Sequence, residues 1–155
     1  MMESRSQEET LEIGRRIGAR MQARTVLALY GGLGTGKTVF SRGLARGLGI
    51  EEPVTSPSFT VVQEYECPDG RMFFHLDMYR IATEDEALMF GIDEYLFADH
   101  AVAVIEWAER IERLLQHPER EASRHGSPVW RVYLEHAGTD TRRIHLPPAL
   151  SDIVA

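Results

Sequence analysis

The spacing of apolar residues predicts a helix near the start of the chain. Between residues 6 and 21, apolar side chains recur along one helix face, at Leu11, Ile13, Ile17 and Met21. Ser6 and Glu9 have the spacing of a capping box, so this helix is expected to begin at Ser6. The arginines of this stretch fall mostly outside the apolar stripe, which favours a covering helix with a solvated basic edge.

A strand and a second helix follow on either side of a glycine-rich segment. Residues 25–30 form an apolar run of strand length. Beyond the glycines, Phe40, Leu44 and Leu48 recur every four residues, as on one face of a helix that Gly49 ends. The pattern therefore predicts strand, loop and helix in that order.

The middle of the chain is predicted to form an exposed loop and then a hairpin. Residues 53–60 contain hydroxyl side chains and two prolines, which favour an extended loop over a helix. This loop either contacts the γ phosphate of a nucleotide or is an ordinary proline-bounded turn. Residues 60–66 and 71–77 have strand character, and the Asp69-Gly70 step between them is a strong turn signal.

Another strand is flanked by two more helices. Thr83 and Glu86 have capping-box spacing and begin a short helix that ends near Gly91. The uninterrupted apolar run at residues 101–105 suits a buried, parallel, central strand. The next helix is predicted to stop at Pro118. Its apolar side chains are Ile111, Leu114 and Leu115.

The C-terminal part is predicted as a polar loop followed by a hairpin. Residues 117–128 are polar and are expected to form a mobile surface loop. Apolar and polar side chains alternate from Trp130 to Leu134, and a turn at residues 138–140 leads to a last strand at residues 142–146. This hairpin is expected at an edge of the sheet.

The glycine-rich segment carries the clearest chemistry. Residues 31–38 read Gly-Gly-Leu-Gly-Thr-Gly-Lys-Thr and match the phosphate-binding loop. Backbone N–H groups of such a loop converge on phosphate oxygens, and Cβ atoms would block their approach. Lys37 is expected to act on the β and γ phosphates during catalysis, and the Thr38 hydroxyl to ligate Mg²⁺. The predicted nucleotide contacts are Gly31, Gly32, Leu33, Gly34, Thr35, Gly36, Lys37, Thr38 and Val39.

Together these elements predict an α/β protein with a P-loop NTPase-like, three-layer fold. We expect a mostly parallel central sheet, antiparallel edge hairpins and flanking helices. With 155 residues and 43% hydrophobic composition, residues 1–155 are expected to form a single domain.

The amino-acid composition bears on which ligands the chain binds. Lys37 is the only lysine, whereas the other sixteen basic residues are arginine. A planar guanidinium is too broad for a glycine-lined phosphate site that an ammonium can enter, which explains the exception. The formal net charge of −7 argues against a dedicated surface for nucleic acid or anionic membranes.

The chain is expected to be cytoplasmic. Its single cysteine, Cys67, cannot form an internal disulfide, and no cluster has zinc spacing, so a reducing compartment is favoured. The N-terminal residues given carry no apolar stretch of the kind found in secretory leaders, and no apolar run approaches membrane-spanning length.

Two acidic residues are candidates for binding the metal or acting in catalysis beside the phosphates. Magnesium bound to a nucleotide needs a carboxylate at the end of a strand near the loop. Glu106 follows the apolar run at 101–105 and is predicted to hold the metal, directly or through water. Asp77 ends the more mixed strand. We expect Asp77 either to position or activate the attacking water, or to contact the ligands that surround the metal.

Two neighbouring residues have open interpretations. His75 lies two residues before Asp77 and either orients that carboxylate or is a hydrogen-bonded structural histidine, the latter being favoured. Trp107 is either a packed core aromatic, which is favoured, or a base-stacking side chain.

With these motifs in order, the chain resembles the TsaE (YjeE) family, the small ATPases of bacterial tRNA threonylcarbamoyladenosine synthesis. The resemblance covers residues 25–109 and rests on five motifs: GGLGTGKT with the following Phe40, VTSPSFT at 54–60, HLDMYR at 75–80, GIDEYL at 91–96 and VIEW at 104–107. Three positions depart from the family's usual residues: Gly32 replaces an Asp, Thr35 replaces an Ala and Ser58 replaces a Thr. The tail beyond Pro118 matches only in its final hairpin.

The resemblance implies an ATPase that associates with the TsaB and TsaD proteins and supports their modification of the tRNA anticodon loop. Contact with tRNA is then indirect, through the complex. The resemblance also implies that Lys37 and Thr38 hold phosphate and magnesium, that Glu106 is the metal-side acid and that Asp77 is needed for hydrolysis. The expected cofactors are ATP and Mg²⁺.

Three other classes compete with this interpretation. A GTPase reads guanine with an Asn-Lys pair, and the chain has no asparagine and no second lysine. A small-molecule kinase needs an acceptor pocket and usually an arginine-bearing lid, for which only residues 117–128 are available. A nucleotide-gated interaction module, with incidental hydrolysis, is the third class.

Overall fold

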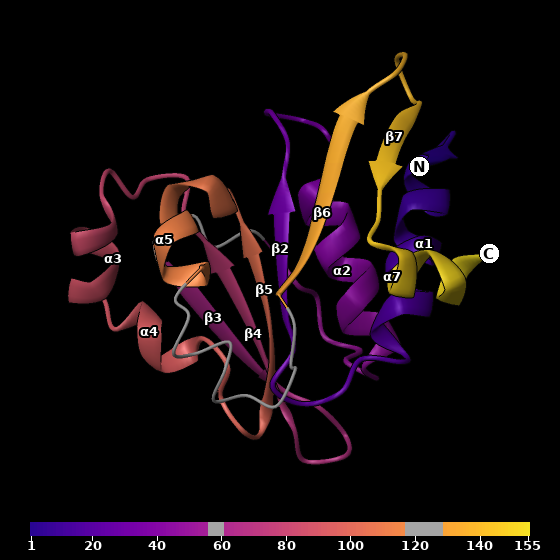
Figure 1. The fold of residues 1–155 in the computed structure, drawn as a ribbon. Coiled ribbons are helices and arrows are strands. Elements are labelled where there is room, and N and C mark those ends of the chain that lie inside the picture. Colours follow the sequence, from indigo (N-terminus) through magenta and orange to yellow (C-terminus); the bar gives the residue numbers. More distant parts are fainter. Residues whose placement is uncertain (56–60, 117–128) are drawn as a thin grey trace.

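A computed structural model describes residues 1–55, 61–116 and 129–155. Most of the loop predicted at 53–60 and the loop predicted at 117–128 lie outside these residues. Within them the chain forms a seven-stranded sheet between layers of helices (Figure 1). In chain order the elements are β1 (Met2–Ser4), α1 (Gln7–Gly18), β2 (Val26–Tyr30), α2 (Lys37–Gly47), β3 (Val62–Glu66), β4 (Met72–Asp77), α3 (Glu84–Met89), α4 (Ile92–Tyr95), β5 (Ala101–Glu106), the 3₁₀ helix η1 (Ala108–Ile111), α5 (Glu112–Leu115), β6 (Val129–His136), β7 (Arg142–His145) and α7 (Pro148–Val154).

The sheet is parallel at its centre and antiparallel at its sides. Its strand order is β1-β7-β6-β2-β5-β4-β3. Strands β6, β2, β5 and β4 run parallel to one another, whereas β3, β7 and β1 each pair antiparallel with their neighbours. All six residues of β5 are buried, as its apolar run predicted. The predicted α/β fold class is confirmed.

The C-terminal hairpin lies further inside the sheet than expected. Strand β6 pairs in parallel with β2, and Tyr133 is the register partner of Tyr30. Strand β1 covers the outer side of β7 and is itself the edge strand. Strand β1 was not predicted, because three residues are too few to display a period. Helix α7 was not predicted either; it begins at Pro148 and buries Leu150 and Val154.

The predicted helix starts are confirmed by their capping contacts. The Ser6 hydroxyl accepts a hydrogen bond from the Glu9 N–H at 3.1 Å, and the Thr83 hydroxyl accepts one from the Glu86 N–H at 3.2 Å. Helix α1 ends at Gly18, earlier than the apolar stripe suggested. Met21 nevertheless belongs to the core, because it is buried just beyond the helix.

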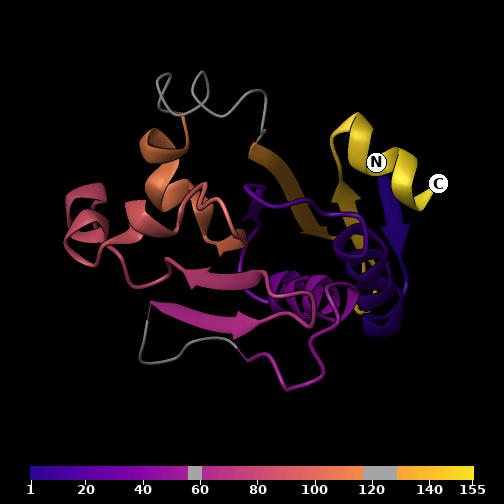
Figure 2. The same cartoon turned by 90° about the horizontal axis from the view of Figure 1, so that it is seen from below.

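Two hydrophobic cores lie on opposite faces of the sheet. One core joins α1 and α2 to the strand side chains on one face of the sheet, such as Leu27, Leu29 and Val104. The other core joins α3, α4, η1 and α5 to the strand side chains on the opposite face, such as Ala28 and Ile105. The view from below separates the same two helix groups on either side of the strands (Figure 2). The alternation of strand side chains thus produces three layers.

Helices α1 and α2 approach each other through glycines. A Cβ atom placed on Gly14, Gly18, Gly43 or Gly47 would lie within 3.0 Å of backbone atoms of the facing helix. Such a distance is shorter than real Cβ contacts allow, so side chains at these positions would push the helices apart. The close packing holds α2 in place, and α2 begins at the phosphate-binding loop.

Side chains also tie the last residue of β2 to its neighbours on the other face. The Tyr30 hydroxyl donates to Glu112 of α5, which forms a 3.0 Å ion pair with Arg131 of β6. The Tyr30 ring stacks on Tyr133 with centroids 4.7 Å apart. Burial and the adjacent Glu112 carboxylate raise the pKa of Tyr30 above its ordinary value. The network anchors the strand end that leads into the loop.

Among the described residues, no helix is long and apolar enough to span a membrane.

Candidate nucleotide-binding site

The phosphate-binding loop connects β2 to α2 and has the backbone that its glycines predict. Gly31, Gly34 and Gly36 have positive φ values of 151°, 72° and 98°. A Cβ on Gly31 would lie within 3.0 Å of the Leu134 carbonyl oxygen on β6. Glycine is therefore required at Gly31 for two reasons, the dihedral angle and the close backbone approach.

The loop opens onto a cleft of about 340 Å³. The cleft is lined by Gln7, Leu33, Gly34, Thr35, Gly36, Lys37, Thr38, Val39, Asp77, Tyr79, Glu106 and Trp107. The structure thus brings together most of the residues predicted as nucleotide contacts and both predicted acids. Gly31 and Gly32 complete the loop just outside this lining.

Side chains hold four consecutive carbonyl oxygens of the loop. Lys37 Nζ donates to Gly31 O at 2.5 Å and to Gly32 O at 2.7 Å. Thr35 Oγ1 also donates to Gly32 O, at 2.9 Å, so the Thr that departs from the family pattern stabilises the loop. The next two carbonyls, of Leu33 and Gly34, are held by the C-terminal hairpin.

His136 Nε2 lies 3.2 Å from Leu33 O, and Arg142 Nη2 donates to Gly34 O at 3.2 Å. In a trans peptide the N–H points opposite to the carbonyl. A side chain that holds a carbonyl therefore also fixes the direction of the N–H group that follows it in the chain. Neither side chain was predicted to act here, since both lie more than 100 residues away from the loop in the sequence.

Lys37 is almost fully buried, with 5% of its surface exposed. Its Nζ lies 4.1 Å from the centre of the Trp107 ring, a cation–π distance. Burial lowers the pKa of Lys37, and the charges of Glu106, Glu109 and Asp77 oppose that shift. An anionic ligand would favour the charged ammonium in the same way as these acids do.

The two predicted acids are neighbours at the carboxyl end of the sheet. Asp77 and Glu106 are register partners on the parallel strands β4 and β5. Glu106 is 2% exposed, and Thr38 Oγ1 donates to its Oε1 at 2.9 Å. Asp77 is half-buried and accepts a hydrogen bond from the Tyr79 N–H at 2.9 Å.

His75 contacts Glu106 rather than Asp77. Its Nε2 hydrogen-bonds to Glu106 Oε2. The side chain of His75 is fully buried, so the favoured interpretation as a hydrogen-bonded interior histidine agrees with its environment. Its other ring nitrogen, Nδ1, has no hydrogen-bond partner among the described residues, so the hydrogen bond that holds the ring goes to Glu106.

Trp107 combines a core contact with a place at the cleft. It is partly buried and packs against the core that includes α3, α4, η1 and α5, as the favoured interpretation expected. It also has a positive φ of 59° and forms part of the cleft wall. Its ring contacts Lys37 and also the ring of Tyr79, whose centroid is 5.0 Å away. An indole at this position shields the Lys37 ammonium from water.

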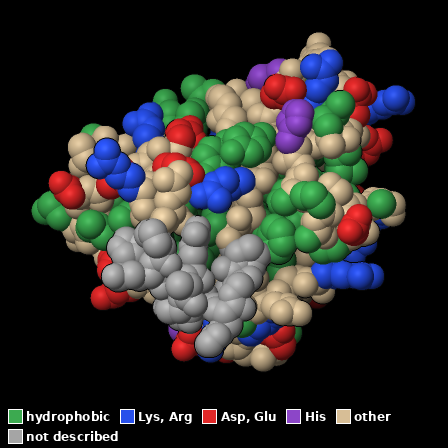
Figure 3. All heavy atoms as spheres, in the orientation of Figure 1, with side chains coloured by type: hydrophobic (Ala, Val, Ile, Leu, Met, Phe, Trp, Pro, Cys, Tyr) green, Lys and Arg blue, Asp and Glu red, His purple; other side chains and the backbone are tan. Residues whose placement is uncertain are grey.

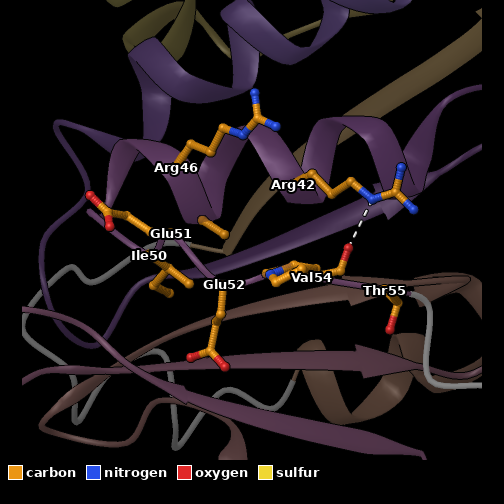
Figure 4. Close-up of a pocket in the computed structure, with 9 residues that line it drawn as sticks. Arg42, Arg46, Ile50, Glu51, Glu52, Val54 and Thr55 are labelled. Atoms are coloured by element: carbon orange, nitrogen blue, oxygen red, sulfur yellow. Dashed lines mark hydrogen bonds between the residues drawn. The ribbon is translucent and has the colours of Figure 1, made fainter.

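A second cavity, of about 290 Å³, lies beside the C-terminal half of α2 (Figure 4). Its lining includes Arg42 and Arg46 of α2 and residues 50–55. Arg42 Nε donates to Val54 O at 2.8 Å and so ties α2 to the segment that enters the loop predicted at 53–60. Of the predicted phosphate-contacting residues in that loop, only Thr55 is among the described residues.

Charged side chains of both signs are interspersed over the described part of the face in Figure 3. This distribution fits the acidic net charge of −7 better than it fits a basic nucleic-acid surface.

The donor set of the cleft fits a magnesium nucleotide. Within the described ranges, no group of three or more His, Cys, Asp or Glu side chains is arranged to hold a metal by itself. Mg²⁺ in nucleotide sites typically has one or two protein ligands and several phosphate or water oxygens. A hydroxyl, Thr38, beside a buried carboxylate, Glu106, matches that requirement.

Comparisons with known proteins agree in sequence and in fold. A family model described as threonylcarbamoyl adenosine biosynthesis protein TsaE matches residues 4–144. A tRNA threonylcarbamoyladenosine biosynthesis protein TsaE from Bacillus subtilis is 40% identical over 138 residues, which cover 88% of this chain and 78% of that protein. One from Treponema pallidum is 40% identical over 109 residues, 70% of this chain and 78% of that protein.

A solved structure supports the same relationship. The crystal structure of Bacillus subtilis YdiB is similar with a TM-score of 0.68 at 30% identity, covering 99% of this chain and 89% of that one. The resemblance predicted from the five motifs is confirmed, and the mostly parallel sheet behind the loop is that of a P-loop protein. The chain therefore belongs to the TsaE family of threonylcarbamoyl adenosine biosynthesis proteins.

Proposed function

We propose that this protein binds ATP with Mg²⁺ at residues 31–39, hydrolyses the nucleotide and thereby supports threonylcarbamoyladenosine formation in tRNA. The observation that carries the proposal is the 2.9 Å hydrogen bond from Thr38 Oγ1 to Glu106 Oε1. It joins the hydroxyl that ends the phosphate-binding motif to an acid from another strand. In P-loop enzymes that pair of groups accompanies the magnesium of a bound nucleotide.

Each residue of the cleft has a role in this proposal. The loop N–H groups bind phosphate oxygens, and Lys37 places its positive charge against the β and γ phosphates. Thr38 supplies a hydroxyl ligand, and Glu106 binds on the metal side, directly or through water. Mg²⁺, when bound, neutralises charge on the phosphate oxygens.

Asp77 is assigned to the hydrolytic step. It lines the same cleft beside Glu106 without taking part in the loop. From this position it orients the attacking water, either by accepting its proton or through the water ligands of the metal. Loss of Asp77 should therefore affect turnover more than nucleotide binding.

The proposal includes the partners TsaB and TsaD and a cytoplasmic location. The names of the relatives place those proteins in tRNA threonylcarbamoyladenosine biosynthesis. Contact with tRNA is proposed to be indirect, through the complex. The acidic net charge and the mixed surface charges support this indirect role.

Two substitutions test the assignment. The isolated protein should hydrolyse γ-labelled ATP slowly and in a magnesium-dependent manner. Lys37→Ala should abolish nucleotide binding in a calorimetric titration, whereas Asp77→Ala should retain binding and lose at least about tenfold in turnover. The opposite order would contradict these roles. Transfer of the label to an acceptor other than water would favour the kinase alternative.

The partnership needs a separate experiment. Purified TsaB and TsaD should be retained by the immobilised protein in the presence of Mg-ATP and should raise its turnover. Retention that depends on ATP, combined with undetectable hydrolysis, would favour a nucleotide-gated interaction module. Lys37→Ala is the matched control for nucleotide dependence.

A further inference from the structure

His75 lies beneath the cleft, where the described part of the chain offers it one polar partner. Its side chain is fully buried on β4, and its Nε2 hydrogen-bonds to Glu106 Oε2. The other ring nitrogen, Nδ1, has no hydrogen-bond partner among the described residues. The ring of Phe73 packs 6.4 Å away, centre to centre.

Packing alone does not explain why an imidazole occupies this position. A buried polar nitrogen without a partner loses its hydrogen bond to water and gains none in the folded chain, which is destabilising. Apolar side chains such as those of Phe73 and Leu76 on the same strand fill the core without that cost. The contact with Glu106 is therefore the interaction that distinguishes His75 from an ordinary core residue.

Glu106 needs such a contact because its carboxylate has two distinct tasks. Oε1 accepts the Thr38 hydroxyl at 2.9 Å and faces the cleft. Oε2 lies 3.3 Å from Ser41 Oγ, but that hydroxyl also lies 3.0 Å from the Lys37 carbonyl and has only one proton to donate. Rotation about the last bond of a Glu side chain is soft. A second donor is needed to hold Oε2.

We propose that His75 is a positioning residue for Glu106: it holds Oε2 from below, so that Oε1 stays directed at Thr38 and at the metal side of the cleft. The inference rests on the proposed function, in which Glu106 serves the magnesium of ATP. Because a carboxylate can only accept, the proton of the neutral ring lies on Nε2 and Nδ1 is bare. Outer partners of this kind typically change metal affinity by 10–100-fold.

A set of three variants tests the proposal. His75→Gln keeps an amide nitrogen at the reach of Nε2, whereas His75→Asn carries its amide at the reach of Nδ1 and cannot extend to Glu106. His75→Leu removes the donor and keeps an apolar filling. Mn²⁺ binding to each protein with ADP is measured by electron paramagnetic resonance, and metal-free nucleotide binding is measured in EDTA.

The expected result separates positioning from folding. The His75→Leu and His75→Asn variants should bind Mn²⁺ at least about tenfold more weakly than the parent protein. The His75→Gln variant should stay within about threefold of the parent. All three variants should bind metal-free nucleotide as well as the parent does. Equal Mn²⁺ affinity in the parent and the Leu variant would overturn the inference. Rescue by Asn as good as that by Gln would also overturn it, and so would loss of metal-free nucleotide binding in the folded Leu variant.

A measurement without nucleotide or metal distinguishes this inference from the proposed function. In a histidine-ring ¹H–¹⁵N spectrum of the free protein, His75 should show the Nε2–H tautomer, and Glu106→Gln should shift that signal. A ring protonated on Nδ1 alone would overturn the inference. The expected spectrum together with no binding of Mg-ATP by the parent protein would instead contradict the proposed function.

Discussion

Gly31 and Gly32 are adjacent in the phosphate-binding loop and meet very different surroundings. Gly31 has a positive φ, and a Cβ there would strike the Leu134 carbonyl and Thr35 Oγ1. A Cβ on Gly32 would have no atom within 4 Å. That open space agrees with the larger residue usual in the family at this position. The first glycine is required by the fold, and the second is not.

We therefore expect Gly31→Ala and Gly32→Ala to behave differently. Gly31→Ala should lower the free energy of unfolding by about 1–3 kcal/mol and weaken nucleotide binding, because the loop must shift to avoid the clash. Gly32→Ala should stay within about 0.5 kcal/mol of the parent. Urea denaturation and titration with a fluorescent nucleotide measure both effects. Equal losses in the two variants would contradict the explanation.

At the scale of elements, the β6–β7 hairpin has an unexpected role. His136 and Arg142 reach from it to two carbonyls of the loop, 103 and 108 residues away in the chain. The hairpin is held on one side by β2 and on the other by β1. A rigid sheet thus supports a loop that must present its N–H groups in a fixed direction.

His136→Ala and Arg142→Ala should each weaken ATP binding about two- to tenfold, because each variant loses one hydrogen bond to the phosphate-binding loop, of about 0.5–1.5 kcal/mol. Arg143→Ala is the matched control, since Arg143 is exposed on the same strand and pairs with Glu135. Calorimetric titration with ATP measures the affinities. A loss as large for Arg143→Ala would indicate a general charge effect instead of a loop contact.

The glycine contact between α1 and α2 is a second property of elements. Gly43 lies in the middle of α2, where alanine normally stabilises a helix by about 1 kcal/mol. Here a Cβ would meet the Leu11 carbonyl of α1 at less than 3.0 Å. The clash should outweigh the propensity gain, so that Gly43→Ala lowers the free energy of unfolding by about 1–3 kcal/mol.

Gly138→Ala is the control for that experiment, because its added Cβ would meet only Thr141, at an ordinary 3.5 Å. Chemical denaturation followed by circular dichroism compares the two variants. A more stable Gly43→Ala protein would show that the helices separate easily and that their close contact does not constrain the fold.

At the scale of the whole molecule, ligand binding and folding are linked. The cleft takes residues from α1, the phosphate-binding loop, α2, β4 and β5, and these are brought together only in the folded chain. A ligand that binds only the folded state stabilises it by about 2.7 kcal/mol at 100 times its Kd. For a chain of 155 residues this corresponds to a rise in Tm of about 5–10 °C.

Saturating Mg-ATP should therefore raise the Tm by about this amount, and EDTA should reduce the shift by removing the metal contribution. Differential scanning calorimetry measures the shift directly. Lys37→Ala should show almost none, since the loop then lacks its only ammonium. A shift of the same size in Lys37→Ala would place the ligand elsewhere.

Short-range patterns in the sequence were enough to predict most of the fold and much of the candidate site. The capping boxes at Ser6 and Thr83, the apolar run of β5 and the phosphate-binding motif all involve residues a few positions apart. Glu106 and Asp77 were each predicted as an acid that ends a strand near the loop, and the structure adds that they are register partners on β5 and β4. Strand β1, helix α7 and the wall position of Trp107 were not predicted, since their environments come from distant parts of the chain.

The chemistry of the loop follows from eight consecutive residues, which supply its N–H groups, its ammonium and its hydroxyl. The side chains that support this chemistry become neighbours only when the chain folds. Thr38 meets Glu106 across 68 residues, His75 meets the same carboxylate across 31, and His136 meets the loop across 103. No local period encodes such contacts, since they depend on strand order and register, which the packing of the whole chain sets.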